Sequence, residues 1–114
     1  MELDKKKCIP CEIGGESLPQ DQIEKNLQDV PNWKLSEKMI GREFEFKDFK
    51  EAMIFVNSVA DLAENEGHHP DITIHWNKVK LDLWTHSVDG LTENDFIVAS
   101  KINKRVNYKW FFKR

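Results

Sequence analysis

The sequence predicts an α+β two-layer sandwich in the order α-β-β-α-β-β-α, with a four-stranded antiparallel sheet covered on one face by three helices. Three observations predict it. In several segments apolar residues recur at spacings of three and four, which is the period of a helix. In four short segments apolar and polar residues alternate, which is the period of a strand. The strand-like segments come in two pairs joined by short turns, so hairpins alternate with helices along the chain.

The first half of the predicted domain contains a short helix followed by a hairpin. Residues 17–31 are expected to form the helix, because three apolar side chains share one of its faces and Pro31 ends the pattern. Residues 33–46 alternate between apolar and polar side chains, which predicts two strands. The turn that joins these strands is expected at residues 36–38.

The second half begins with the longest predicted helix, residues 48–66. We expect Asp48 to cap its start and Gly67 to end it. The predicted core stripe of this helix consists of Phe49, Ala52, Met53, Val56, Val59, Ala60 and Ala63. Pro70 then favours an extended backbone for His69, so the pair His68-His69 is expected in a rigid exit between helix and strand.

A second hairpin and a last helix complete the predicted fold. Residues 72–85 contain two alternating segments. A turn at Asn77-Lys78 would pair Trp76 with Val79 and place both side chains in the core. Residues 91–107 predict the last helix, in which Thr92 and Asp95 have the spacing of a capping box.

Length, charge and hydropathy restrict the class of protein. The 114 residues are expected to divide into an N-terminal arm (1–16), one domain (17–107) and an aromatic tail (108–114). The formal net charge of -3 lacks the basic excess that nucleic-acid binders usually show. No apolar run reaches the roughly 18 residues of a membrane helix, and the N-terminus lacks an apolar signal core. We therefore expect a cytoplasmic protein that binds neither nucleic acid nor a membrane.

The two cysteines, Cys8 and Cys11, have CxxC spacing and lie in the predicted arm. This motif is half of a four-thiolate zinc site, and the second half is missing from the sequence. A redox pair is the alternative, although no βαβ pattern surrounds the motif. We favour a third interpretation, in which the cysteines belong to a packed or loosely ordered arm.

Three of the four histidines are expected to converge. A hairpin returns the chain to the point where it began, so His86, at the end of the second strand, should lie near His68 and His69. His75 falls on the polar face of its strand and is expected to be solvated or structural. Three converging imidazoles suit general acid-base catalysis, because histidine titrates near neutral pH.

Two alternatives compete with acid-base catalysis. Single histidines are more often ordinary surface or hydrogen-bonded residues than catalysts. Three histidines can also bind a catalytic zinc ion, but adjacent histidines rarely ligate one metal with good geometry, and no HExxH-like spacing is present. We therefore expect a site without a metal or a cofactor.

These residues resemble a known family. The series runs Glu64, three residues, His68-His69-Pro70, five residues, Trp76, nine residues, His86, eight residues and Asp95. This spacing is similar to the signature of the pterin-4a-carbinolamine dehydratases, and the expected order of elements agrees with the family fold over about residues 18–106.

The resemblance implies a reaction and a site. Family members convert 4a-hydroxytetrahydrobiopterin, the product of aromatic amino acid hydroxylases, to quinonoid dihydrobiopterin by removing the 4a-hydroxyl as water and a proton from N5. By similarity, His68 is the leading catalyst, His86 is its acid or base partner, and His69 binds and orients the pterin. Further candidate substrate-binding residues are Glu64, Trp84 and Asp95.

Some of these residues also have structural interpretations. Glu64 could be a solvated carboxylate at a helix end, Asp95 a helix cap, and Trp76 a core residue. Trp84 falls on the other face of its strand and suits a pocket wall or an interface.

The resemblance also implies partners and alternative functions. Family members form dimers or dimers of dimers, and open sheet edges favour such pairing, so we expect a homodimer or homotetramer. Some animal members bind a homeodomain transcription factor as dimerisation coactivators. A pterin-binding role in molybdopterin metabolism is a third possibility, and a functional link to an aromatic amino acid hydroxylase follows from the first.

Overall fold

A computed structural model describes residues 3–8 and 16–106 of the chain. The elements are η1 (Leu3–Lys5), α2 (Gln20–Leu27), β1 (Lys34–Ser36), β2 (Met39–Glu45), α3 (Phe49–Glu66), β3 (Asp71–His75), β4 (Lys78–Leu83), η2 (His86–Val88) and α4 (Glu93–Val106). The predicted order of helices and strands is confirmed, with the 3-10 turns η1 and η2 added. Cys11 and the aromatic tail lie outside the described residues.

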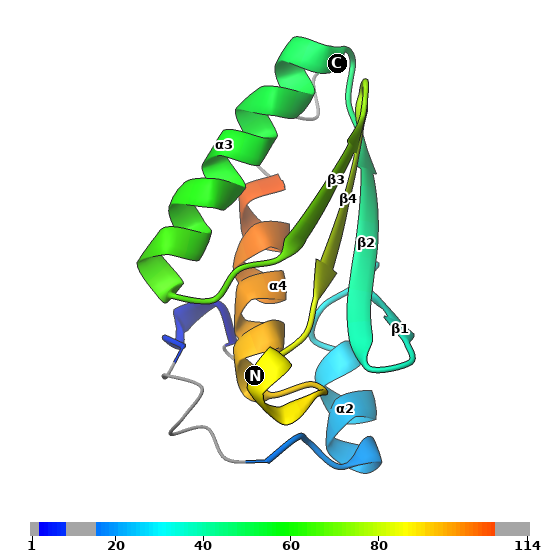
Figure 1. Cartoon of the computed structure of the whole chain (residues 1–114), viewed down its shortest axis with the longest axis vertical. Helices are drawn as coiled ribbons and strands as arrows, with labels where there is room; N and C mark the ends of the chain where they lie inside the picture. The colour runs from blue at the N-terminus through cyan, green and yellow to red at the C-terminus, as the bar shows by residue number, and fades with distance from the viewer. Residues whose placement is uncertain (1–2, 9–15, 107–114) are drawn as a thin grey trace.

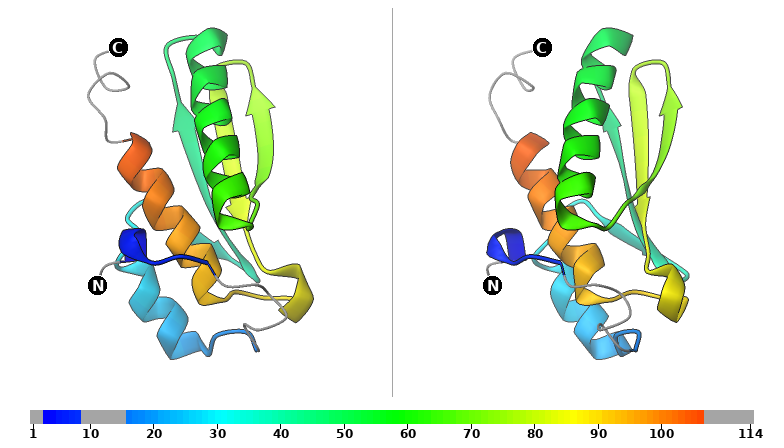
Figure 2. Two further views of the ribbon diagram at one scale, coloured as in Figure 1. Left: turned by 90° about the vertical axis from the view of Figure 1, so that its left-hand side faces the viewer. Right: turned by 60° about the vertical axis from the view of Figure 1, so that its left-hand side comes forward.

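The four strands form one antiparallel sheet in the order β1-β2-β4-β3 (Figure 1). Two hairpins, β1-β2 and β3-β4, meet where β2 pairs with β4, with Ile40 opposite Leu83 and Phe44 opposite Val79. Helices α3 and α4 lie on the same side of the sheet (Figure 2). The opposite face of the sheet carries polar residues, among them Glu43 of β2 and Lys80 of β4. Because the helices cover one face only, the predicted two-layer sandwich is confirmed.

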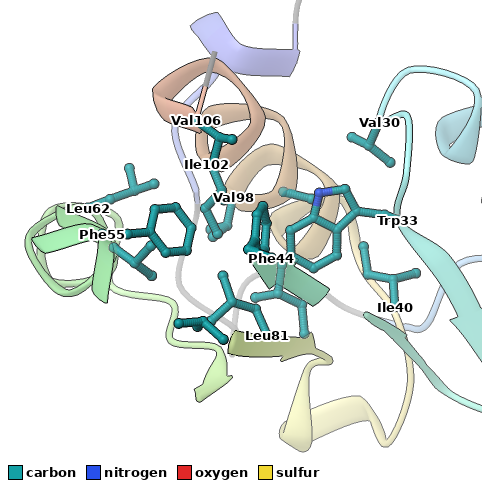
Figure 3. Packing of buried hydrophobic residues seen from close by; sticks show 14 of the residues in the cluster. Val30, Trp33, Ile40, Phe44, Phe55, Leu62, Leu81, Val98, Ile102 and Val106 are labelled. Carbon is teal, nitrogen blue, oxygen red and sulfur yellow. The ribbon is translucent and has the colours of Figure 1, made fainter. Parts of the chain in front are cut away.

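The hydrophobic core fills the space between the sheet and the helices (Figure 3). Phe55 of α3 packs against Phe44 and Phe46, with ring centroids 4.8 and 5.0 Å away. The buried residues of α3 are Glu51, Ala52, Phe55, Val56, Val59, Leu62 and Ala63. The predicted stripe was therefore partly wrong: Phe49 and Ala60 are exposed. Helix α3 contacts α4 as well as the sheet, so its apolar face includes Phe55 and Leu62.

The turn of the second hairpin differs from the prediction. It falls at Trp76-Asn77, so that His75 pairs with Lys78. Asn77 is held from outside the hairpin, because its side-chain amide donates to the carbonyl of Phe46 and its own carbonyl accepts from the Phe46 N–H. Trp76 consequently takes a left-handed conformation with φ 53° and is 67% exposed. The prediction that Trp76 packs in the core was wrong.

Both ends of α3 lie where the predicted capping residues place them. The Asp48 carboxylate accepts a 2.9 Å hydrogen bond from the N–H of Glu51, and Gly67 ends α3 in the left-handed region at φ 69°. Helix α2 is shorter than predicted, since it ends at Leu27. Within the described ranges, no helix is long and apolar enough to cross a membrane.

The described part of the arm crosses the ends of α3 and α4. Leu3 is buried in the core, and Lys6 forms an ion pair with Glu93 at the start of α4. The N–H of Cys8 donates to the carboxylate of Glu66, which also accepts from Lys101 at 2.5 Å. These contacts hold the arm beside the residues that precede His68.

Candidate active site

The histidine pair lies where the chain leaves α3. The left-handed conformation of Gly67 turns the backbone, and the N–H of His68 still bonds to the carbonyl of Ala63 at 3.3 Å. The two neighbours then differ in environment: the side chain of His68 is 6% exposed, and that of His69 is 57% exposed. Local backbone geometry thus gives one buried and one exposed imidazole.

The third histidine joins this pair, as predicted. His86 begins η2, which follows β4, so the β3-β4 hairpin brings it back to the start of β3. The histidines share a concavity of about 450 Å³ whose lining residues are Gly67, His68, His69, Pro70, Asp71, Trp84, His86 and Ser87. The end of α3, η2 and the start of α4 lie toward the same end of the molecule (Figure 1).

A buried carboxylate holds His68. Asp95 is fully buried on α4, and its Oδ1 lies 2.6 Å from Nε2 of His68. Its other oxygen, Oδ2, accepts hydrogen bonds from the hydroxyl of Thr85 and from the N–H of Thr92. Because Thr85 gives its only hydroxyl proton to Asp95, the 2.9 Å contact between the two threonine hydroxyls has Thr92 as its donor.

This network determines how His68 can react. A carboxylate only accepts hydrogen bonds, so Nε2 of His68 carries the proton that points at Asp95. In the neutral imidazole, the lone pair then lies on Nδ1. Asp95 thus orients the His68 ring, and Nδ1 is the nitrogen left to accept a hydrogen bond.

Asp95 also fulfils part of its predicted capping role. The hydrogen bond from the Thr92 N–H to Asp95 is one half of a capping box. In place of the other half, the N–H of Asp95 donates to the backbone carbonyl of Thr92 at 3.2 Å. The same carboxylate therefore caps the start of α4 and orients an imidazole.

His69 and Glu64 form the exposed counterpart of this pair. Nε2 of His69 lies 2.7 Å from the Glu64 carboxylate, which is 79% exposed. Glu64 therefore lies beside the histidine pair, and its partner is the exposed histidine of the two. Solvent screens such a pair, so it contributes little to the stability of the fold.

His86 has an aromatic partner. Its ring lies 4.0 Å from that of Trp84, centroid to centroid, with 31° between the planes. The ammonium of Lys38 lies 5.2 Å from the Trp84 centroid and pairs with Asp89 at 2.5 Å. Trp84 therefore forms part of the wall of the concavity, as one of the two predictions for it stated.

A larger concavity of about 590 Å³ lies on the outer face of the sheet. Its charged lining is mixed, with Lys34, Lys80, Glu43 and Asp82 among its residues, and it includes no histidine. We take the smaller concavity as the candidate site because three imidazoles line it.

Cys8, the described cysteine of the CxxC motif, is a free and partly buried thiol. Burial, followed by the charge of Glu66 and a hydrogen bond to it, raises the pKa of the Cys8 thiol to about 12. Cys8 is therefore a neutral thiol at pH 7 and a poor nucleophile or metal ligand. Within the described ranges, no group of three His, Cys, Asp or Glu side chains is placed to hold a metal ion.

Sequence reasoning missed the hydroxyls of Thr85 and Thr92 and the ammonium of Lys38. Thr85 reaches Asp95 because its backbone bonds to Gly90 close the loop around η2. The spacing of Thr85, Gly90 and Asp95 is visible in the sequence, but no general rule relates it to this loop. Lys38 belongs to the turn of a different hairpin, and its contact depends on the assembled sheet.

Most of the chain is similar to known proteins. Residues 16–105 match the family model described as Pterin 4 alpha carbinolamine dehydratase. One relative is a protein of Alkaliphilus metalliredigens, which is named provisionally as a pterin-4-alpha-carbinolamine dehydratase. It is 46% identical over 105 residues, which cover 90% of this chain and 95% of that protein. The pterin-4-alpha-carbinolamine dehydratase 2, mitochondrial, of Arabidopsis thaliana is 41% identical over 109 residues, covering 90% of this chain and 58% of that protein.

Two solved structures have a similar fold. A Brucella melitensis protein described as a transcriptional coactivator/pterin dehydratase is 34% identical, with a TM-score of 0.75 over 78% of this chain and 97% of that one. A pterin dehydratase-like protein, described as a RuBisCO assembly factor in the alpha-carboxysome, is 20% identical, with a TM-score of 0.58 over 69% of this chain and 94% of that one. The second likeness concerns the fold alone.

Proposed function

The chain belongs to the pterin-4a-carbinolamine dehydratase family, and from this premise we propose that it is a hydro-lyase acting on 4a-hydroxytetrahydrobiopterin. The reaction eliminates water and yields quinonoid dihydrobiopterin, which recycles the product of an aromatic amino acid hydroxylase. The observation that carries the proposal is the concavity shared by His68, His69 and His86. Its volume lies within the range typical of small-molecule sites.

The proposed chemistry requires two proton transfers. The bond between C4a and the hydroxyl oxygen breaks, the N5–H bond breaks, and a C4a=N5 double bond forms. We assign His68 as the base that takes the N5 proton, because Asp95 holds its Nε2–H and leaves Nδ1 to accept. His86 gives a proton to the departing hydroxyl, which leaves as water. Exchange with solvent then restores both imidazoles.

The other residues of the concavity are assigned to binding. His69 orients the pterin from the exposed rim, supported by Glu64. Trp84 provides an aromatic wall beside His86. Asp95 acts through His68 and is a positioning residue, since its own oxygens are occupied by protein donors.

Single histidine variants test the proposal. The purified chain should accelerate dehydration of a freshly generated 4a-carbinolamine, followed by absorbance. His68→Ala and His86→Ala should each lower kcat by about 100- to 10,000-fold, which is the usual contribution of an acid-base group. His69→Ala should raise KM more than it lowers kcat. Asn57→Ala, at an exposed position of α3 outside the concavity, is the control and should behave as the parent.

Two results would contradict the proposal in different ways. A parent protein with no acceleration over buffer would remove the enzymatic function. An active parent whose activity survives all three substitutions would show that the reaction occurs elsewhere. A chelator is expected to leave the rate unchanged, and a loss of rate would favour the zinc alternative.

We also propose that the chain forms a homodimer or homotetramer through the β3 edge. All five residues of β3 are exposed, including Ile72 and Ile74, and Trp76 follows them at the turn. An exposed apolar edge strand is a template for pairing with another chain. Light scattering at micromolar concentration should give a mass of two or four chains, and a monomer would contradict this proposal.

A further inference from the structure

Among the three histidines of the site, His86 has the fewest protein contacts that restrain its ring. It is exposed, it begins a three-residue 3-10 turn, and its ring nitrogens have no hydrogen-bond partner among residues 3–8 and 16–106. An exposed imidazole ordinarily samples several rotamers, which lowers the fraction of time it spends facing a ligand. A residue that acts on a substrate from this position requires another restraint.

The ring of Trp84 supplies such a restraint. The two rings overlap at a centroid distance of 4.0 Å with only 31° between their planes, a geometry close to offset stacking. The Nε1 atom of the indole is buried, and it has no hydrogen-bond acceptor in the described part of the chain. One edge of the indole is thus enclosed by protein while its ring contacts His86.

The β1-β2 hairpin supports the indole. Lys38 lies in the turn between β1 and β2, 5.2 Å from the Trp84 centroid, which is within cation–π range. The same ammonium pairs with Asp89, the residue that follows η2. Lys38 therefore contacts the chain on both sides of η2, before it at Trp84 and after it at Asp89.

The charged groups around His86 do not restrain its ring in the way that the contact with Trp84 does. His68 is engaged by Asp95 across the concavity, and His69 by Glu64 at its rim. Asp71 lines the concavity from the start of β3. Asp89 pairs with Lys38. Each of these groups except Asp71 has a protein partner of its own, and no hydrogen bond or ion pair joins any of them to His86 within the described ranges.

We propose that Trp84 is a positioning residue that holds His86 in the concavity, and that Lys38 supports Trp84 from the β1-β2 turn. The catalytic part of this inference rests on the proposed function, because it assumes that His86 acts on the substrate. The positional part does not, because it concerns the ligand-free protein. The β1-β2 hairpin thereby becomes part of the support of a site to which it contributes no lining residue.

Nuclear magnetic resonance of the ligand-free protein tests the positional part. The ring current of the indole should shift the ring protons of His86 upfield, and His86→Gln identifies their signals by removing them. Trp84→Leu should abolish the upfield shift, whereas Trp84→Phe should retain part of it. Unchanged His86 shifts in Trp84→Leu would overturn the proposal whether or not the protein is an active dehydratase.

Kinetics test the catalytic part. Trp84→Leu should lower kcat by about 10- to 100-fold, as expected when a catalytic group is displaced by about 1 Å, and should raise KM by a smaller factor because Trp84 also lines the concavity. Trp84→Phe should restore kcat to within about threefold, and Lys38→Gln should lower it only about two- to fivefold, the factor that corresponds to an exposed cation–π contact. Lys34→Gln on β1 is the matched control and should match the parent.

The outcomes separate the two proposals. A parent without dehydratase activity overturns the proposed function and leaves the resonance experiment to decide whether Trp84 holds His86. An active parent in which Trp84→Leu loses the upfield shift but keeps kcat within twofold overturns the positioning role. A Trp84→Leu protein that fails to fold shifts the decision to Trp84→Phe and Lys38→Gln, where unchanged His86 shifts in both would overturn the proposal.

Discussion

The two sides of the concavity hold their histidines by different means. On the α4 side, His68 is buried against Asp95, and two further hydrogen bonds fix that carboxylate. On the η2 side, His86 is exposed, and its ring lies against that of Trp84. The first side is built as part of the core, and the second is built on the surface.

This difference separates stability from reactivity. Fixing a buried carboxylate with three hydrogen bonds requires that every partner stays in place, since an unpaired buried polar group is costly. A surface ring contact adds little to stability but leaves its imidazole open to a ligand. Damage to the buried side should therefore unfold the protein as well as inactivate it, whereas damage to the exposed side should affect the reaction alone.

The largest expected effect tests the buried side. Asp95→Ala should lower the free energy of unfolding by about 3 kcal/mol or more, because it leaves His68, Thr85 and the Thr92 N–H without their buried partner. Urea denaturation measures the change. Asp61→Ala, on the exposed face of α3, is the control and should stay within about 0.5 kcal/mol of the parent. A similarly small loss for Asp95→Ala would contradict the contrast between the two sides.

A second effect concerns the carboxylate next to the site. Burial alone would raise the pKa of Glu66, but hydrogen bonds from Lys101 and the Cys8 N–H, with the charges of Lys101 and Lys7, lower it below the ordinary value. A carboxyl with a lowered folded-state pKa stabilises the fold above its unfolded pKa, and this contribution is lost as the pH falls through the folded-state pKa.

Glu66→Gln should therefore cost about 1–2 kcal/mol at pH 7. It should also reduce the loss of stability between pH 7 and about pH 3, because the variant lacks the group that titrates. Urea titrations at several pH values measure both changes. Glu45→Gln on the exposed side of β2 is the control. An unchanged pH profile in Glu66→Gln would contradict the assignment.

A third effect tests the turn that separates the two neighbouring histidines. Gly67 is left-handed, and a Cβ added to it would meet no atom within 4 Å, so only backbone strain opposes a side chain there. Gly67→Ala should cost about 1 kcal/mol, and Gly67→Asn should cost less because asparagine tolerates this conformation. Thermal unfolding distinguishes the two. Equal losses would indicate a steric cause instead of a conformational one.

The smallest expected effect lies at the exposed rim. Glu64→Gln removes the charge that faces His69, but both side chains are mostly exposed, so stability should change by less than about 0.5 kcal/mol. The KM for the pterin should rise modestly while kcat stays near the parent value. A loss of kcat as large as that of His68→Ala would show that Glu64 acts in the reaction itself.

Local patterns in the sequence predicted most of the fold. The caps at Asp48 and Gly67 depend on residues within one turn, and both are confirmed. The convergence of His86 with the histidine pair follows from hairpin geometry, and it is confirmed as well. The catalytic roles of these residues stay predictions, because geometry alone does not test them.

Contacts between distant segments explain the errors. Trp76 lies in the turn because Asn77 is bound to Phe46, which belongs to the end of another hairpin. Phe55 is buried because it packs against Phe44 and Phe46 at the end of β2, and periodicity cannot locate that contact. The hydroxyl of Thr85 reaches Asp95 only through the loop around η2. Each error reflects a tertiary contact that overrides or extends a local preference.

The central position of β2 and β4 has a consequence for the kinetics of folding. Each hairpin closes over a two-residue turn and each helix is local, but β2 meets β4 only across the whole of α3 and β3. Closing such a long loop is entropically slow compared with forming the hairpins themselves. We therefore expect the transition state to contain this central pairing, with mutations at Phe44 or Val79 slowing refolding more than mutations in β1 do.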